Sequence, residues 1–168
     1  PDWLAAGYRV LLDRDRIADR LPPPSVLAYV PRPPSDAEYR AVVEEFWWES
    51  LYVAKYIGRG ELLPARYSLE TVLRYRCLVP MLEWYVQIGR GWEQSVGVRG
   101  SGLRWLLAPD ERTALDATYA GDTLRGHAEA LEAMVELFTH AARAIARDLG
   151  YTYPSTVDRE TRMLLRRD

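Results

Sequence analysis

A proline-rich segment divides this chain of 168 residues into two unequal parts. Between positions 22 and 34 the chain contains Pro22, Pro23, Pro24, Pro31, Pro33 and Pro34. Because each proline fixes φ and removes a backbone donor, the segment predicts an extended linker. We therefore predict a domain boundary here, with residues 1–21 ending one domain, residues 22–34 forming the linker and residues 35–168 forming a second domain.

The part before the linker holds one segment that favours β-structure, Tyr8-Arg9-Val10-Leu11-Leu12. Its alternating, β-prone side chains predict a short strand. A single strand is not stable alone, and the sequence offers no convincing second strand. We therefore expect this strand to be the last of a sheet whose other strands precede residue 1.

After the linker the hydrophobic spacing becomes helical. Ser35-Asp36-Ala37-Glu38 predicts a capping box at the start of a helix that extends to about residue 57 and stops at Gly58. Further helices are predicted over residues 64–88 with a kink at Pro80, in short pieces over 103–119, from a cap at Asp122 to residue 149, and over 156–166 after a cap at Ser155. The glycine-rich residues 89–102 predict a loop. The expected fold class is mainly all-α: a bundle of about five helices preceded by a short strand.

Composition excludes several classes of protein. The formal net charge is −2, so no overall basic field points to a nucleic-acid partner. No apolar stretch approaches the length of a membrane span, so we expect no membrane partner. Cys77 is the only cysteine, which excludes a disulfide within the chain and fits a reducing compartment. We expect a cytoplasmic protein in which Cys77 is a buried, unreactive thiol.

One face of the first predicted helix concentrates charged and aromatic side chains. Three- and four-residue spacing places on it Glu45, Trp48, Glu49, Tyr52, Lys55, Tyr56 and Arg59. Lys55 is the only lysine, and a lysine is a compact charge on a flexible stem, suited to a single phosphate oxygen. Carboxylates beside aromatic rings suit cationic, polyhydroxylated ligands. The alternative is a helix buried on two sides, with Glu49 and Lys55 in ordinary salt bridges.

Other candidate motifs favour structural roles. Asp13 and Asp15 have the Asp-x-Asp spacing of a metal site, but they follow the predicted strand instead of lying within it. Gly100-Ser101-Gly102 lacks the ending of a phosphate-binding loop. His127 and His140 do not have metal-ligand spacing to each other or to Cys77, so no metal site is predicted.

Short motifs follow one another in order through most of the chain: Phe46-Trp47-Trp48, Tyr52-Val53-Ala54-Lys55, Glu61-Leu62, Ala65-Arg66-Tyr67, Met81-Leu82-Glu83-Trp84-Tyr85, Thr118-Tyr119, Glu136-Leu137-Phe138 and Gly150-Tyr151. In this order they resemble the aminoglycoside 6-adenylyltransferases, or streptomycin adenylyltransferases. Upstream, residues 10–15 resemble the end of that family's nucleotidyltransferase domain. The resemblance extends from about Gly7 to Pro154.

The resemblance implies a two-domain enzyme that transfers AMP from ATP to the 6-hydroxyl of streptomycin with the help of Mg²⁺. It implies that this chain is the C-terminal helical domain, and that the N-terminal nucleotidyltransferase domain carries the metal-binding aspartates. The chain alone would then be inactive and would contain no catalytic residue. Lys55 would bind the nucleotide, and the cationic drug would contact Trp48, Glu49, Tyr52, Glu61 and Glu83.

Two other functions fit the same residues. The chain could be a non-catalytic helical module that binds a small cationic ligand. It could also be a structural or interaction domain that binds neither the drug nor ATP.

Overall fold

The computed structural model describes residues 8–21 and 29–165. These residues are mainly helical and contain no strand. In chain order the elements are η1 (Ala18–Arg20), α2 (Asp36–Gly58), α3 (Leu62–Arg66), η3 (Tyr67–Leu78), α4 (Val79–Tyr85), η4 (Val98–Gly100), α5 (Leu103–Leu106), α6 (Pro109–Ala117), α7 (Leu124–Leu149) and α8 (Ser155–Leu165). Part of the predicted linker (22–28) and the predicted end of the last helix (Arg166) lie outside the described residues.

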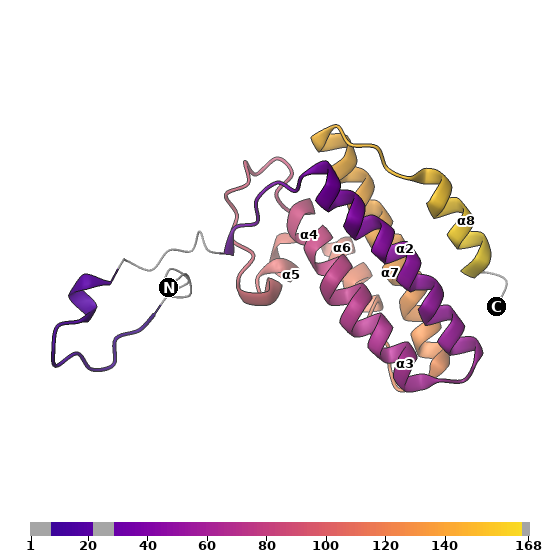
Figure 1. The fold of residues 1–168 in the computed structure, drawn as a ribbon, viewed down its shortest axis with the longest axis horizontal. Helices are drawn as coiled ribbons and strands as arrows, with labels where there is room; N and C mark the ends of the chain where they lie inside the picture. Colours follow the sequence, from indigo (N-terminus) through magenta and orange to yellow (C-terminus); the bar gives the residue numbers. More distant parts are fainter. Residues whose placement is uncertain (1–7, 22–28, 166–168) are drawn as a thin grey trace.

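The helical prediction is confirmed, but the predicted strand at residues 8–12 is not found. These residues are irregular, and Leu11 and Leu12 are exposed. The physical reason is that the described part of the chain offers no neighbouring strand to complete a ladder of backbone hydrogen bonds. Asp13 follows this segment, and its carboxylate accepts the backbone N–H groups of Ile17 and Ala18 at 2.9 and 2.8 Å. Asp13 therefore caps the short helix η1, which lies apart from the bundle (Figure 1).

The capping box at the start of α2 forms as predicted. The Ser35 hydroxyl accepts the backbone N–H of Glu38, and the Glu38 carboxylate accepts the backbone N–H of Ser35. The guanidinium of Arg32 also pairs with Glu38 and, with the Ser35 donors, lowers the pKa of this carboxyl to about 2. α2 ends at Gly58, as the sequence indicates.

The second long helix differs from the helix predicted over residues 64–88. Its backbone begins at Leu62 and ends at Tyr85, and residues Tyr67–Leu78 of it form the π-helix η3. At its end the N–H of Val79 donates to the carbonyl of Arg74, five residues earlier. Pro80 follows directly as the second residue of α4, inside this continuous helix. Proline lacks the N–H that a regular helix uses at this position, so the π-helical turns lie where the hydrogen-bond pattern is interrupted.

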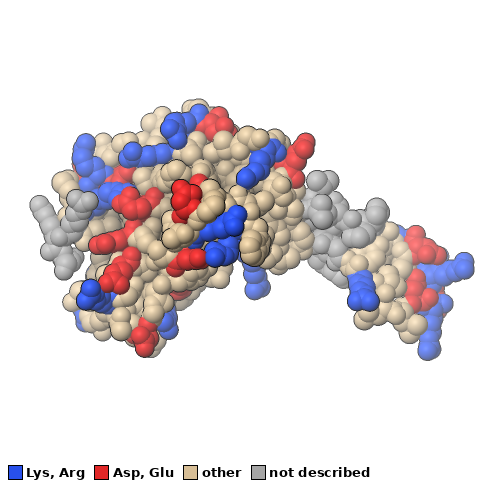
Figure 2. Space-filling model, turned by 180° about the vertical axis from the view of Figure 1, so that it is seen from behind, with Lys and Arg blue, Asp and Glu red and all other residues tan. Residues whose placement is uncertain are grey.

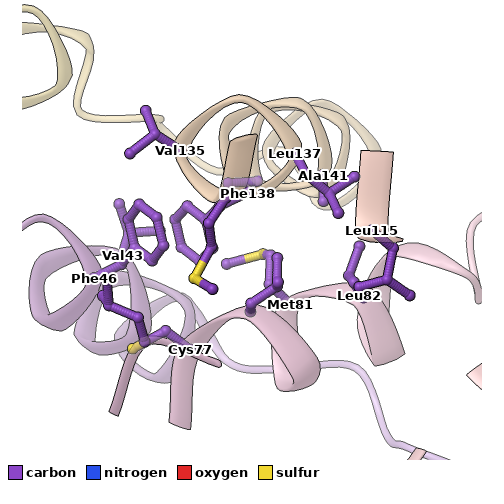
Figure 3. Packing of buried hydrophobic residues seen from close by; sticks show 14 of the residues in the cluster. Val43, Phe46, Cys77, Met81, Leu82, Leu115, Val135, Leu137, Phe138 and Ala141 are labelled. Atoms are coloured by element: carbon purple, nitrogen blue, oxygen red, sulfur yellow. The ribbon is translucent and has the colours of Figure 1, made fainter. Parts of the chain in front are cut away.

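α2, η3, α4 and α7 enclose the core, with α6 against one end of α7 (Figure 1). The rings of Phe46 on α2 and Phe138 on α7 stack with centroids 3.7 Å apart, and Met81 of α4 lies beside them (Figure 3). The Tyr39 hydroxyl donates to the backbone carbonyl of Ala142 at 3.0 Å, which also joins α2 to α7. The face seen in Figure 2 carries acidic and basic side chains intermixed.

Two predicted helix boundaries shift slightly in the C-terminal part. Thr123, not Asp122, caps α7, because its hydroxyl accepts the N–H of Gly126 at 3.0 Å. Gly150 ends α7 in the left-handed conformation, with φ 73°, which glycine adopts at least cost. α8 includes Ser155 instead of starting after it.

α8 packs against α2, and the buried carboxylate of Asp158 links it to α7. This carboxylate accepts hydrogen bonds from Arg143 and Tyr153, both at 3.0 Å, and also pairs with Arg162.

Among the described helices, none has the length and apolar character needed to cross a membrane.

Candidate functional site

A row of aromatic rings runs along the outward face of α2. Trp48 and Tyr52 are one turn apart, with ring centroids 5.8 Å from each other, and Tyr56 continues the row at 6.1 Å from Tyr52. The row forms because residues spaced by four share one face of a helix. The core residues of α2 occupy the opposite face, so the indole of Trp48 is 61% exposed.

Lys55 lies against this row. Its Nζ is 4.9 Å from the centroid of the Tyr52 ring and 5.9 Å from that of Tyr56, within range of cation–π attraction. No carboxylate in the described part of the chain forms an ion pair with it. The alternative in which Lys55 forms an ordinary salt bridge is therefore not seen. Lys55, Tyr52, Trp48 and Leu51 line an open hollow of about 200 Å³.

Glu49 lies beside this row, toward η3. It is half-buried, and neither it nor Glu45 forms an ion pair or hydrogen bond with another described residue. Both carboxylates lie near Cys77 of η3: burial raises the pKa of the Cys77 thiol to about 12, and the charges of Glu45 and Glu49 add to this effect. Neither acid is ion-paired, although the exposed cation Arg76 of η3 acts on the same thiol with the opposite sign.

The two other acidic candidates lie away from the row. Glu61 is exposed in the turn between α2 and α3, where its backbone N–H donates to the carbonyl of Tyr56 at 2.9 Å. Glu83 is on α4 and lies beside Gly100: a side chain at that glycine would place its Cβ 3.5 Å from Oε1 of Glu83. Burial raises the pKa of the Glu83 carboxyl. The structure thus joins Trp48, Tyr52 and Lys55 in one hollow and leaves Glu61 and Glu83 outside it.

The described residues do not fit a magnesium site. No group of three or more His, Cys, Asp or Glu side chains in residues 8–21 and 29–165 could hold a metal ion. Both carboxylate oxygens of Asp13 already accept backbone N–H groups. Acidic ligands for Mg²⁺ would therefore have to come from elsewhere.

A cluster that the sequence analysis missed joins α4, α6 and α7. The Tyr85 hydroxyl donates to the carboxylate of Glu111 and lies 3.1 Å from Nε2 of His140. Burial, with the hydrogen bond to Glu111, raises the pKa of Tyr85 to about 12, so the phenol keeps its proton at neutral pH. No local sequence pattern predicts this cluster, because Glu111 and His140 are 26 and 55 residues away from Tyr85 in the chain.

The family model for streptomycin adenylyltransferase matches residues 3–167. The chain belongs to this family. The curated aminoglycoside 6-adenylyltransferase of Staphylococcus aureus is 28% identical over 147 residues, covering 88% of this chain and 52% of the relative. The enzyme of the same name from Bacillus subtilis is 28% identical, covering 87% of this chain and 51% of the relative.

A solved structure supports the same assignment. The crystal structure of an aminoglycoside 6-adenyltransferase from Bacillus subtilis matches with a TM-score of 0.72 and 26% identity, over 80% of this chain and 51% of that one. The chain therefore spans about half the length of the relatives it matches. The resemblance read from the ordered motifs is confirmed.

Proposed function

We propose that this chain is the C-terminal helical part of an aminoglycoside O-adenylyltransferase, which transfers AMP from ATP to a hydroxyl of a drug such as streptomycin and so gives antibiotic resistance. The observation that carries the proposal is the family match over residues 3–167, together with relatives named aminoglycoside 6-adenylyltransferase. A chain that covers about half of such relatives is expected to supply part of the substrate cleft.

In this proposal Lys55 binds the nucleotide. Its ammonium group is exposed, is not neutralised by a described carboxylate and lies over the Tyr52 ring, so it is free to meet an incoming anion. A flexible point charge suits a triphosphate, whose oxygens move as the reaction proceeds. Lys55 would hold and orient the ATP phosphates while AMP is transferred.

The drug would bind beside it through charge and stacking. Streptomycin is cationic, and the unneutralised carboxylate of Glu49 would accept hydrogen bonds from its guanidinium groups. Trp48 and Tyr52 would stack on the apolar faces of the sugar or cyclitol rings. Glu61 and Glu83 would contribute if the drug extends along α3 or α4, because neither acid is engaged by another described residue.

The catalytic acids would belong to an N-terminal nucleotidyltransferase domain. When bound there, Mg²⁺ would supply charge neutralisation and activation of the drug hydroxyl. The described residues of this chain do not fit the ion, so the chain by itself would be inactive. We expect the whole enzyme to act in the cytoplasm, where ATP is present.

The test is AMP transfer from α-labelled ATP to streptomycin, comparing a longer protein that contains this chain with the 168-residue chain alone. The proposal expects labelled drug from the longer protein and none from the chain. Drug binding by the longer protein without AMP transfer would replace the proposal with a non-catalytic binding module. If the longer protein neither binds nor modifies the drug, the interpretation of this chain as an interaction domain would replace the proposal.

A further inference from the structure

A second and larger hollow lies on other elements of the bundle. It has a volume of about 960 Å³ and is enclosed by the end of α4, the α5–α6 segment and the last turns of α7. Three arginines line it, Arg90, Arg112 and Arg147, together with Trp105. None of these residues belongs to the row on α2.

Two of the arginines are held by neutral groups. Arg90 donates to the backbone carbonyls of Val86 and Leu106. The Nε of Arg112 donates to the carbonyl of Leu107 at 2.9 Å, which leaves its two terminal nitrogens for another partner. A carbonyl orients a guanidinium without cancelling its charge, so both arginines remain net cations at the hollow.

The lining residues themselves carry more basic than acidic groups. Arg147 is exposed and makes no hydrogen bond or ion pair with any residue in 8–21 or 29–165. Of the two acids in the lining, Glu111 already accepts the Tyr85 phenol and the N–H of Ala108 at 2.8 Å. Asp148 is the other, so three guanidinium groups and two carboxylates line the hollow, and Asp110 lies just outside the lining, near Tyr85.

Trp105 gives the hollow a flat apolar wall. Its indole is 71% exposed although Trp is among the side chains that gain most from burial. The guanidinium of Arg112 lies 5.9 Å from the Trp105 ring centroid, so charge and ring face the same space. A ligand with an anionic group next to a flat ring would satisfy both.

We infer that this hollow binds a small organic phosphate that carries an aromatic ring, with the phosphate between Arg112 and Arg147 and the ring on Trp105. Guanidinium forks match phosphate oxygens in geometry and charge. Stacking on the indole adds affinity for any flat ring, without selecting one ring type. The inference does not depend on AMP transfer, because Lys55 and Glu49 take no part in it.

The test is calorimetric titration of the 168-residue chain with 1-naphthyl phosphate, compared with 1-naphthol and inorganic phosphate. We expect 1-naphthyl phosphate to bind more tightly than 1-naphthol and more tightly than inorganic phosphate. Arg147→Gln should weaken binding of 1-naphthyl phosphate roughly tenfold, because one charge-assisted contact is lost. Trp105→Ala should weaken it at least roughly fivefold, because the stacking surface is lost. Neither side chain supports the core, so both variants should keep the melting temperature of the parent.

Matched variants on η3 serve as controls. Arg76→Gln and Tyr75→Ala remove an exposed cation and an exposed aromatic ring outside both hollows, and they should leave binding of 1-naphthyl phosphate unchanged. The inference is overturned if the probe binds no better than 1-naphthol or inorganic phosphate. It is also overturned if Lys55→Gln abolishes binding while Arg147→Gln does not.

Discussion

The guanidinium of Arg74 donates to both the hydroxyl and the backbone carbonyl of Thr118, each at 2.7 Å. Arg74 is on the π-helix η3 and is only 2% exposed, and Thr118 follows α6, 44 residues later. Glu70 supplies the opposite charge one turn away, and the Tyr119 ring lies 4.0 Å from the guanidinium carbon. This contact fixes the segment that leads into α7 against η3.

We expect Arg74→Met to lower the free energy of unfolding by roughly 2–4 kcal/mol, because it leaves the buried oxygens of Thr118 without their donor. Urea unfolding followed by circular dichroism would measure the change. Arg76→Met, at an exposed position on the same helix, should stay within about 0.5 kcal/mol of the parent. Equal effects of the two substitutions would contradict this role for Arg74.

The buried Cys77 should report on unfolding of the bundle. Burial raises the pKa of its thiol to about 12, so the thiol keeps its proton and is shielded from reagents at pH 8. We expect a disulfide reagent such as DTNB to leave the native chain unlabelled and to label it in urea, with the labelled fraction following the loss of helix. Rapid labelling of the native chain would mean that η3 opens without global unfolding.

Local signals in the sequence predicted most of the helices, because a cap or a stop depends on neighbours within one turn. Ser35 with Glu38 and Gly150 are such signals, and the structure confirms both. The prediction of a strand at residues 8–12 was wrong, because a strand is stabilised by pairing with another strand and not by local preference alone. That Trp48 and Lys55 share one face could be predicted from helical spacing, because both lie on a single helix, and the structure places them around one hollow. The contact between Tyr85 and Glu111 could not follow in that way, since it joins different helices.

If the proposed function holds, removing the charge of Lys55 should weaken the use of ATP by a longer protein that contains this chain. We expect Lys55→Gln to raise KM for ATP or to lower kcat, by roughly tenfold in kcat/KM, because one charge-assisted phosphate contact is lost. Arg59→Gln removes an exposed cation at the C-terminal cap of α2 and serves as the control. Unchanged kinetics with both substrates in Lys55→Gln would exclude the nucleotide role.

The proposed drug site predicts a different pair of effects. Glu49→Gln and Trp48→Ala should each weaken binding of streptomycin by the longer protein, and the effect of Glu49→Gln should shrink at high salt because it is electrostatic. Calorimetry would measure the dissociation constants. Trp105→Ala removes an indole of similar exposure outside the row and should leave drug affinity unchanged. Loss of affinity in Trp105→Ala alone would move the drug site to the hollow near α6.

Glu83 makes the stability of the bundle depend on pH in a definite direction. Burial raises the pKa of its carboxyl above the ordinary 4.5, so the folded chain holds this proton more tightly than the unfolded chain. Its contribution is fully present below the unfolded pKa and is lost as pH rises through the folded pKa. We therefore expect Glu83→Gln to raise the melting temperature relative to the parent at pH 7 and to leave it nearly unchanged at about pH 3.5, where the parent carboxyl is protonated in both states. Glu132→Gln, at an exposed carboxylate of α7, should show no such difference between the two pH values. A gain in Glu83→Gln that is equal at both pH values would mean that packing, and not the buried charge, is responsible.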